Sequence, residues 1–350
     1  MNLKTLCAIF ASVIIFGALL PVAASAQNRQ VQERDQSNAG QQINDAVGRT
    51  ASRMQDQQKF RLQYKMQKGQ TLRWDVEQIA TTDASIAGFD EKSSLRTRSV
   101  IAWKVLSVDD KGNITIQDQL ESAVEWQKTG EADPISYDSS KDEEVHEKFQ
   151  ATAEKIGKPI ATTTIEPSGK IVQRENHIQT MEFGMGKFTL QMPEEPMAIG
   201  AQWNIPEELQ TRKRDHTIKV VKTRMLYTLR KVENGVATIS FRREVLTPIE
   251  DPNVRSQIQQ KLNQGSLLFD ITKGCITKKT VQWDEKVQGF EGDDSYLHYV
   301  GNYSMNLLAE GESLSSSAVP TKSLKPLAPK VGENSSNYIR PRNGKPTLRK

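Results

Sequence analysis

Residues 101–120 read IAWKVLSVDDKGNITIQDQL, and this stretch decides the fold. Apolar residues alternate with other residues on either side of the central DDKG, which is a typical turn sequence. Successive side chains of a β-strand point to opposite faces, so this period of two predicts an antiparallel hairpin. Ile101, Trp103 and Val105 then share one face of the first strand, and Ile114 lies on the return strand.

The same pattern occurs again in residues 225–241, around Asn234 and Gly235. Asn-Gly is the strongest short hairpin signal, because both positions tolerate positive φ. The chain therefore contains at least two long hairpins, one in each half of the sequence.

Two apolar patterns with a helical period interrupt the predicted strands. The first predicts a helix near residues 142–156, with Ser140 or Asp142 as its cap. The second predicts a helix near residues 252–263 that is ended by Gly265. The apolar positions that set these periods are Val145, Phe149, Ala153 and Ile156, then Val254, Ile258 and Leu262.

The order of predicted elements is the same in the two halves: hairpin, helix, hairpin. Residues 60–176 form the first unit, residues 200–308 form the second, and residues 177–199 connect them. The turn glycines that would correspond are Gly112 with Gly235 and Gly169 with Gly274. We interpret this order as an internal repeat; the alternative is a chance match between two β-rich halves.

These patterns together predict one β-rich domain over residues 59–310. Its fold class is mainly β (α+β), a curved antiparallel sheet or open barrel with two short helices. The full chain of 350 residues is long enough for such a domain to bury a sizeable core.

The first 26 residues have the parts of a secretory signal peptide. Lys4 is followed by an apolar run over residues 6–20 and then by small residues ending at Ala26. Cleavage between Ala26 and Gln27 predicts an exported protein in the periplasm, the cell envelope or the medium. The alternative is an uncleaved N-terminal anchor.

Polar segments flank the predicted domain. Residues 27–58 hold nine glutamines and few large apolar residues, so we expect a disordered leader. Residues 311–350 contain five prolines and many serines, and we expect a disordered tail. The tail carries eight basic and two acidic residues, whereas residues 27–310 carry 38 basic and 41 acidic residues. The net positive charge of the chain therefore comes from its tail.

Residues that could carry catalysis are scattered. The four histidines form no pair at helical spacing, which gives no support for a metal site, and nothing suggests a cofactor. No serine lies in a Gly-x-Ser-x-Gly setting. Cys275 remains alone once Cys7 is removed with the signal peptide, and we interpret it as a neutral thiol rather than a reactive one. The sequence therefore predicts no catalytic residue, and we expect the protein not to be an enzyme.

Aromatic and methionine residues are the remaining candidates for binding. All five tryptophans lie on predicted strands, where they either line a cavity or fill a core. Residues 181–197 are rich in methionine, which packs adaptably. Met181, Met185, Met192 and Met197 are candidates for a lid over an apolar site; the alternative is ordinary packing on the sheet.

The sequence resembles a family of secreted bacterial proteins of unknown function that is abundant in planctomycetes. The motifs that carry the resemblance are residues 68–74 (KGQTLRW), 137–141 (YDSSK), 157–160 (GKPI), 167–171 (PSGKI) and 192–196 (MPEEP). The order of elements is also similar, more loosely, to the periplasmic carriers that shuttle lipoproteins in an open barrel. These resemblances imply export and a β-rich body, but no catalytic residue.

Two functions from different classes follow from these observations. The first is a non-catalytic exported protein that binds a lipid or another apolar or amphipathic envelope component in a β cavity. The alternative is an interaction protein whose basic tail binds anionic envelope polymers. Neither reading involves specific binding of nucleic acid. A carrier is expected to have an interior that its own side chains do not fill, whereas an interaction protein is expected to have a solid core.

Overall fold

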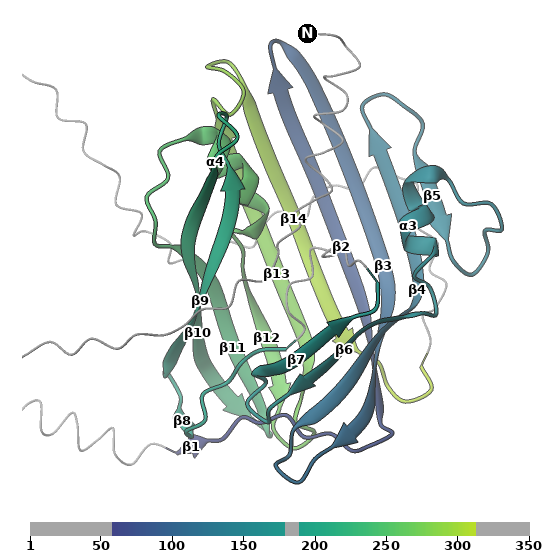
Figure 1. Cartoon of the computed structure of the whole chain (residues 1–350), viewed down its shortest axis with the longest axis vertical. Helices are drawn as coiled ribbons and strands as arrows, with labels where there is room; N and C mark the ends of the chain where they lie inside the picture. The colour runs from purple at the N-terminus through teal and green to yellow at the C-terminus, as the bar shows by residue number, and fades with distance from the viewer. Residues whose placement is uncertain (1–57, 179–188, 313–350) are drawn as a thin grey trace, which may run out of the picture. The chain divides into compact units, whose positions relative to one another are not determined.

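The computed structural model describes residues 58–178 and 189–312, which belong to one compact unit. The predicted fold class is confirmed: the unit is mainly antiparallel β, its large sheet is open, and it carries two short helical segments (Figure 1). The signal peptide, the leader up to residue 57 and the tail from residue 313 lie outside the described residues.

The large sheet has twelve strands. Eleven of them follow one path, in the order β7 (Ile171–Asn176), β6 (Pro159–Ile165), β4 (Ile114–Thr129), β3 (Phe89–Val108), β2 (Thr71–Ile86), β14 (Tyr296–Leu307), β13 (Cys275–Gln288), β12 (Gln264–Asp270), β11 (Val236–Val245), β10 (Ile218–Glu233) and β9 (Gln202–Arg212). The twelfth strand, β5 (Ile135–Asp138), pairs with β4. A separate pair joins β1 (Lys59–Phe60) to β8 (Met197–Ala198).

Both predicted hairpins are present. β3 pairs with β4, and β10 pairs with β11 through a two-residue turn. Asn234 and Gly235 have φ values of 49° and 77°, as the Asn-Gly signal requires. The strand order also runs the same way in the two halves, with β14 between them. A duplication would produce this order, but the duplication itself stays a prediction.

A further hairpin, formed by β2 and β3, extends much farther than the sequence indicated. β2 and β3 continue through a polar stretch to a tight turn at Ala87 and Gly88. Ion pairs between the two strands stabilise this part: Arg98 binds Asp75 at 3.0 Å, and Arg96 binds Glu77 at 2.6 Å. These cross-strand pairs replace the apolar alternation that would otherwise predict a strand.

The helices are shorter than predicted. The first consists of the 3₁₀ turn η1 (Glu147–Phe149) and α3 (Gln150–Ala153), and the second of α4 (Pro252–Ile258) and η2 (Gln259–Lys261). Pro252 begins α4, as predicted.

Two predicted helix ends were wrong. The cap of the first helix is His146 and not Ser140 or Asp142. The Asp142 carboxylate accepts a hydrogen bond from the Asp138 N–H in the preceding turn, so it does not cap the helix. Gly265 does not end the second helix either. It belongs to β12, where the ring of Phe241 lies over it in space that a Cβ atom would occupy.

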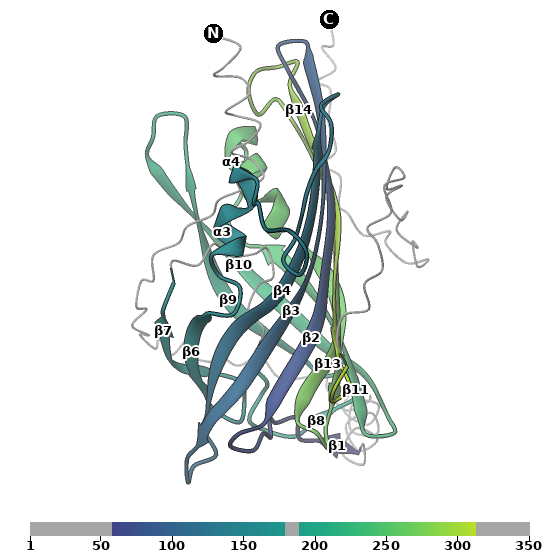
Figure 2. The ribbon, with the colours of Figure 1, turned by 90° about the vertical axis from the view of Figure 1, so that its right-hand side faces the viewer.

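The main core lies on one face of the sheet, which we call the inner face. Both helical segments lie on this side (Figure 2). We call the end with the turns at Gly112, Gly169, Gly235 and Gly274 the lower end, and the end near α3 and α4 the upper end (Figure 1). The opposite, outer face carries ion pairs and hydroxyl pairs, such as Thr115 with Thr164 at 3.0 Å.

An extended segment, residues 62–66, closes the lower end. Leu62, Tyr64 and Met66 point alternately into the core, although the segment pairs with no strand. Instead, Tyr64 N–H donates to the Pro167 carbonyl, and Lys65 N–H donates to the Gly274 carbonyl. The segment thus joins the turn at Gly169 to the turn at Gly274, which are corresponding turns in the predicted repeat.

Candidate functional site

One row of residues crosses nine strands of the inner face, and we call it the transverse row. It consists of Trp203, Tyr227, Phe241, Gly265, Val281, Tyr303, Gln78, Thr97 and Glu125, each paired in register with the next. The strands from β9 to β14 contribute its aromatic and apolar half, and the strands from β2 to β4 contribute its polar half. The sheet therefore presents an amphipathic line across its inner face.

The aromatic half consists of rings in contact. Trp203 and Tyr227 stack with centroids 5.3 Å apart, and Tyr227 lies 5.9 Å from Phe241. The Trp203 indole N–H donates to the Gln191 carbonyl at 3.0 Å, which fixes that ring. Trp203 and Tyr227 are only partly buried. This part of the row can pack against an apolar chain or ring.

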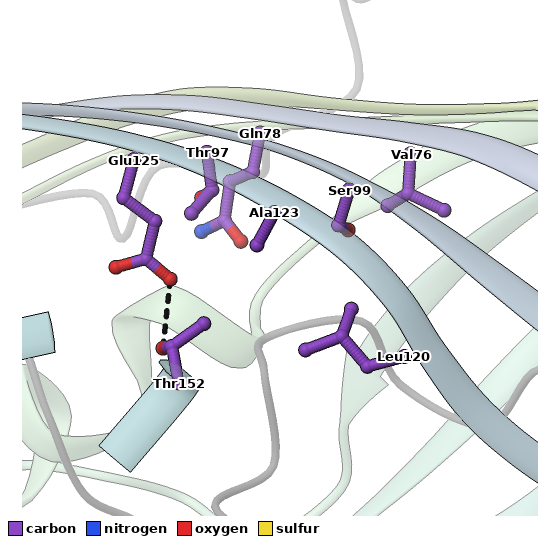
Figure 3. Close-up of a pocket in the computed structure, with 8 residues that line it drawn as sticks. All are labelled: Val76, Gln78, Thr97, Ser99, Leu120, Ala123, Glu125 and Thr152. Atoms are coloured by element: carbon purple, nitrogen blue, oxygen red, sulfur yellow. Dashed lines mark hydrogen bonds between the residues drawn. The ribbon is translucent and has the colours of Figure 1, made fainter. Parts of the chain in front are cut away.

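The polar half contributes to a small pocket beneath α3 (Figure 3). Its volume of about 30 Å³ holds roughly two water molecules. Its polar lining residues are Gln78, Thr97, Ser99, Glu125 and Thr152, and its apolar ones are Val76, Leu120 and Ala123. The hydroxyl, amide and carboxyl groups can hydrogen-bond a polar ligand group or water.

Glu125 is the ionisable group of this pocket. The Thr152 hydroxyl donates to it at 2.8 Å (Figure 3). Burial raises the pKa of Glu125 above its ordinary value, while the hydrogen bond from Thr152 and the charge of Lys155 act in the opposite direction. Lys155 is itself buried, and burial lowers its pKa. The carboxyl group of Glu125 and the amino group of Lys155 thus lie close enough to influence each other at one end of the transverse row.

A second charged group lies at the aromatic end. Lys279 Nζ is 5.9 Å from the ring centroids of both Phe241 and Tyr303. Burial lowers the pKa of Lys279 to about 8, although the charge of Glu207 acts to raise it. An ammonium group in this position can bind an anion or stack on aromatic rings.

A hydrogen-bonded network lies above the aromatic end. The Arg243 guanidinium donates to the Glu207 carboxylate and, at 3.1 Å, to the Thr223 hydroxyl. It also donates to the Lys261 carbonyl at 2.7 Å, which connects β11 to η2. This network holds the short helix against the sheet beside the transverse row.

The predicted lid residues lie in different places. Met192 and Met197 are buried in the main core near the lower end, while Met181 and Met185 lie outside the described residues. The predicted cleavage site, Ala26 and Gln27, also lies outside them. Met192 and Met197 thus pack in the core, and the lid itself stays a prediction.

The other candidates are placed as follows. All five tryptophans lie on strands, and Trp74, Trp103 and Trp283 are buried in the core. Cys275 is buried, and burial raises the pKa of its thiol to about 11, which keeps it neutral. His146, the cap of the first helix, is exposed.

Sequence reasoning missed Lys279 and the polar half of the row. Lys279 was one of several lysines on a predicted strand, and only the register shows that it faces the core side. One signal was available: glycines inside strands often mark a close approach by another group. The ring of Trp283 lies over Gly301, just as Phe241 lies over Gly265.

Within residues 58–178 and 189–312, no group of three or more His, Cys, Asp or Glu side chains is placed to hold a metal ion. In the same ranges, no helix is both long and apolar enough to cross a membrane.

Comparisons with known proteins give only distant similarities. No protein-family model and no curated protein matches the sequence. Among solved structures, the chain is similar to one of lipid–protein interactions in lipovitellin, with 10% identity and a TM-score of 0.43; the match covers 73% of this chain and 27% of that one. It is also similar to the translocator domain of the autotransporter NalP from Neisseria meningitidis, with 7% identity and a TM-score of 0.22, over 75% of this chain and 95% of that one. Both TM-scores are low, so neither similarity carries a functional argument.

Proposed function

We propose that this protein is an exported, non-catalytic binding protein whose ligand is an amphipathic component of the cell envelope, such as a lipid. The observation that carries the proposal is the transverse row, which is aromatic on one half of the inner face and polar on the other. A ligand with an apolar part and a polar part matches both halves. Export is inferred from the basic start, apolar run and small residues of the first 26 residues.

The packed lower end supports a binding site at the upper end. Burial of apolar ligand surface is favourable by roughly 25 cal/mol per Å². Trp203 and Tyr227 are partly exposed and can contribute to such burial, whereas Leu62, Tyr64 and Met66 already fill the lower core. We therefore propose that the ligand lies along the transverse row rather than under a methionine lid.

Native mass spectrometry of protein purified from its own envelope tests the proposal directly. The expected result is a lipid-sized mass that stays bound to the protein. The matched in vitro test uses delipidated protein and an environment-sensitive hydrophobic dye. Thr97→Trp should fill the polar half of the row and weaken dye binding at least tenfold, because the new ring occupies the ligand's space.

Thr81→Trp is the control, because Thr81 lies on the neighbouring strand and points to the outer face. It should leave dye affinity within twofold of the wild type. Melting temperatures of both variants show whether they fold. Wild-type protein that carries no lipid and binds no dye, or equal losses in the two variants, would contradict the proposal.

A second function is favoured by the charge of the tail, which is eight basic against two acidic residues. We propose that residues 311–350 bind anionic envelope polymers. Deleting them should leave the melting temperature unchanged and weaken retention on an anionic matrix at low salt, because exposed charges are screened as salt rises. A melting temperature that drops by several degrees would mean that the tail packs on the domain.

A further inference from the structure

The pocket beneath α3 lies where two rows of residues cross β2, β3 and β4. The transverse row contributes Gln78, Thr97 and Glu125, and the next row below it contributes Val76, Ser99 and Ala123. Threonine, serine and alanine have short side chains, so the sheet and α3 enclose a hollow here. The side chains of Gln78, Thr97 and Ser99 extend from the sheet toward the side of α3 (Figure 3).

The hydroxyl groups of this pocket differ from those of the outer face. On the outer face of the same two strands, Thr81 and Ser94 form a hydrogen bond with each other at 3.3 Å. Among the described residues, the hydroxyls of Thr97 and Ser99 form no such bond, and both side chains are partly exposed. Polar groups in the wall of a pocket bind water or a polar group of a ligand, so these two hydroxyls are available for binding.

The size of the pocket limits the group that can enter it. Its volume of about 30 Å³ holds roughly two water molecules. A hydroxymethyl group fills about the same space, with one carbon and one oxygen atom. A carboxylate, a trimethylammonium, a phosphate or a sugar group is larger. The pocket therefore fits the smallest polar end that an amphipathic molecule can have.

The lining groups favour a partner that both donates and accepts hydrogen bonds. The carboxylate of Glu125 accepts, and the Thr152 hydroxyl already donates to it at 2.8 Å. Gln78, Thr97 and Ser99 can each donate and accept. A ligand hydroxyl can donate to Glu125 and accept from Thr97, whereas a carboxylate has no donor and a trimethylammonium group has neither donor nor acceptor.

A primary ammonium group also donates to carboxylates, but a cation already lies near Glu125. Lys155 is buried, and its charge acts on Glu125. A second positive charge in the pocket would be repelled by Lys155. A neutral hydroxyl group avoids this repulsion.

We propose that the pocket beneath α3 binds the terminal hydroxyl of a neutral amphipathic ligand, a long-chain alcohol, whose apolar chain leaves along the transverse row. This inference rests on the proposed function and names the polar group of the ligand. The ligand hydroxyl donates to the Glu125 carboxylate and accepts from the Thr97 hydroxyl, in the space of roughly two water molecules.

The test compares four single-chain ligands of equal chain length, below their micellar and solubility limits: decanol, decanoate, decylammonium and decyltrimethylammonium. Calorimetric titration of delipidated full-length protein at neutral pH measures each affinity. Decanol should bind most tightly, at least about tenfold better than decanoate, because the anion meets the Glu125 carboxylate without a proton to donate. Decyltrimethylammonium should bind most weakly, because its head group is too large and forms no hydrogen bond.

Two conservative variants place the binding in the pocket. Thr97→Val keeps the shape of the side chain but removes its hydroxyl, and it should weaken decanol binding about three- to tenfold. Glu125→Gln keeps the size of the side chain and removes the negative charge. It should lower the preference for decanol over decanoate about tenfold, because the amide accepts a hydrogen bond less strongly and does not repel an anion.

Thr81→Val is the matched control, because it removes a hydroxyl from the outer face of the neighbouring strand. It should leave all four affinities within twofold of the wild type. Melting temperatures of the three variants show that each is folded under the conditions of the titration.

The outcomes separate this inference from the proposed function. If none of the four ligands binds, the proposed function fails and the inference fails with it. If decanoate or decylammonium binds as tightly as decanol, the pocket does not select a hydroxyl, and the inference fails while the proposed function stands. Equal effects of Thr97→Val and Thr81→Val, or an unchanged preference in Glu125→Gln, would likewise overturn the inference alone.

Discussion

The two ends of the inner face differ in packing: side chains fill the lower end, whereas the upper end contains a small pocket with polar groups. At the lower end, Leu62 and Tyr64 fill the space between the hairpin turns, and Tyr64 accepts a hydrogen bond from Leu190 N–H at 2.8 Å. At the upper end, Gln78 and Thr97 line a pocket that has room for water, and charged groups lie beneath the helices. Both ends belong to the same strands, which pass from one environment to the other without a break.

This difference separates stability from binding within one sheet. The main core cluster runs from Leu62 and Tyr64 at the lower end up to Tyr303 in the transverse row, and its burial supplies most of the hydrophobic stabilisation. The upper end can then carry hydroxyl, carboxyl and ammonium groups that contribute little to folding. We therefore expect substitutions at the lower end to affect unfolding, and those at the upper end to affect ligand binding.

The largest expected effect is that of Gly169→Ala at the lower end. Gly169 has φ +83°, and a Cβ atom there would collide with the Leu190 carbonyl oxygen and the Tyr64 ring. We expect the free energy of unfolding to fall by more than about 3 kcal/mol. Gly69→Ala is the control: its φ is +84°, but nothing lies near its Cβ position, so only the backbone cost of about 1–2 kcal/mol applies. Equal losses in urea unfolding would show that residues 62–66 are not firmly packed.

A smaller contrast is expected from one substitution made at both ends. Leu62 is 1% exposed in the core, whereas Leu95 lies partly buried on the upper part of β3. Leu62→Ala should cost about 2–5 kcal/mol, as is typical of buried leucines. Leu95→Ala should cost about 1 kcal/mol, because less apolar surface is lost. Denaturant unfolding of both variants measures the difference, and a larger loss for Leu95 would invert the comparison.

The smallest predicted effect is a pH dependence at the lower end. Asp118 is buried beside Trp103 in register, and burial raises its pKa to about 6, while Arg174 at 3.7 Å acts in the opposite direction. The folded state then binds the proton more tightly than the unfolded state. Wild-type stability should therefore rise as pH falls from about 6 toward 4, by an amount on the order of 2 kcal/mol.

Asp118→Asn is the corresponding variant, and it should be more stable than the wild type at pH 7.5. It should also lack the slope between pH 6 and 4, which urea unfolding at several pH values can measure. A slope of equal size in the variant would assign the effect to other carboxyl groups.

Much of the fold was predictable because short sequence motifs specify its turns and helix starts. Asn234 and Gly235 specify a hairpin whatever surrounds them, and Pro252 marks the start of a helix. The full length of β2 and β3 was not predictable from apolar period, because polar cross-strand pairs such as Arg96 with Glu77 and Thr81 with Ser94 join them. Those pairs form only after the register is set, and the sequence pattern does not show the register.

The candidate site was less predictable than the fold. The transverse row combines residues from nine strands that are far apart in sequence, so no local motif marks it. Lys279 becomes unusual only when its neighbours across the sheet, such as Leu267 and Met305, are known. The methionines were visible in the sequence, but the described ones, Met192 and Met197, pack in the core.

The closure of the lower end has a consequence for the folding kinetics. The Lys65 ammonium donates to the Ile271 carbonyl across 206 residues of sequence, and the Trp74 indole donates to the Ile276 carbonyl across 202. β2, the first long strand, also pairs with β14, the last one. Contacts between residues so distant in sequence form slowly, because a large loop must close first. During synthesis, residues 62–74 must therefore wait for nearly the whole domain, and until then the edge of β2 is open to a holding chaperone or to premature pairing with another chain.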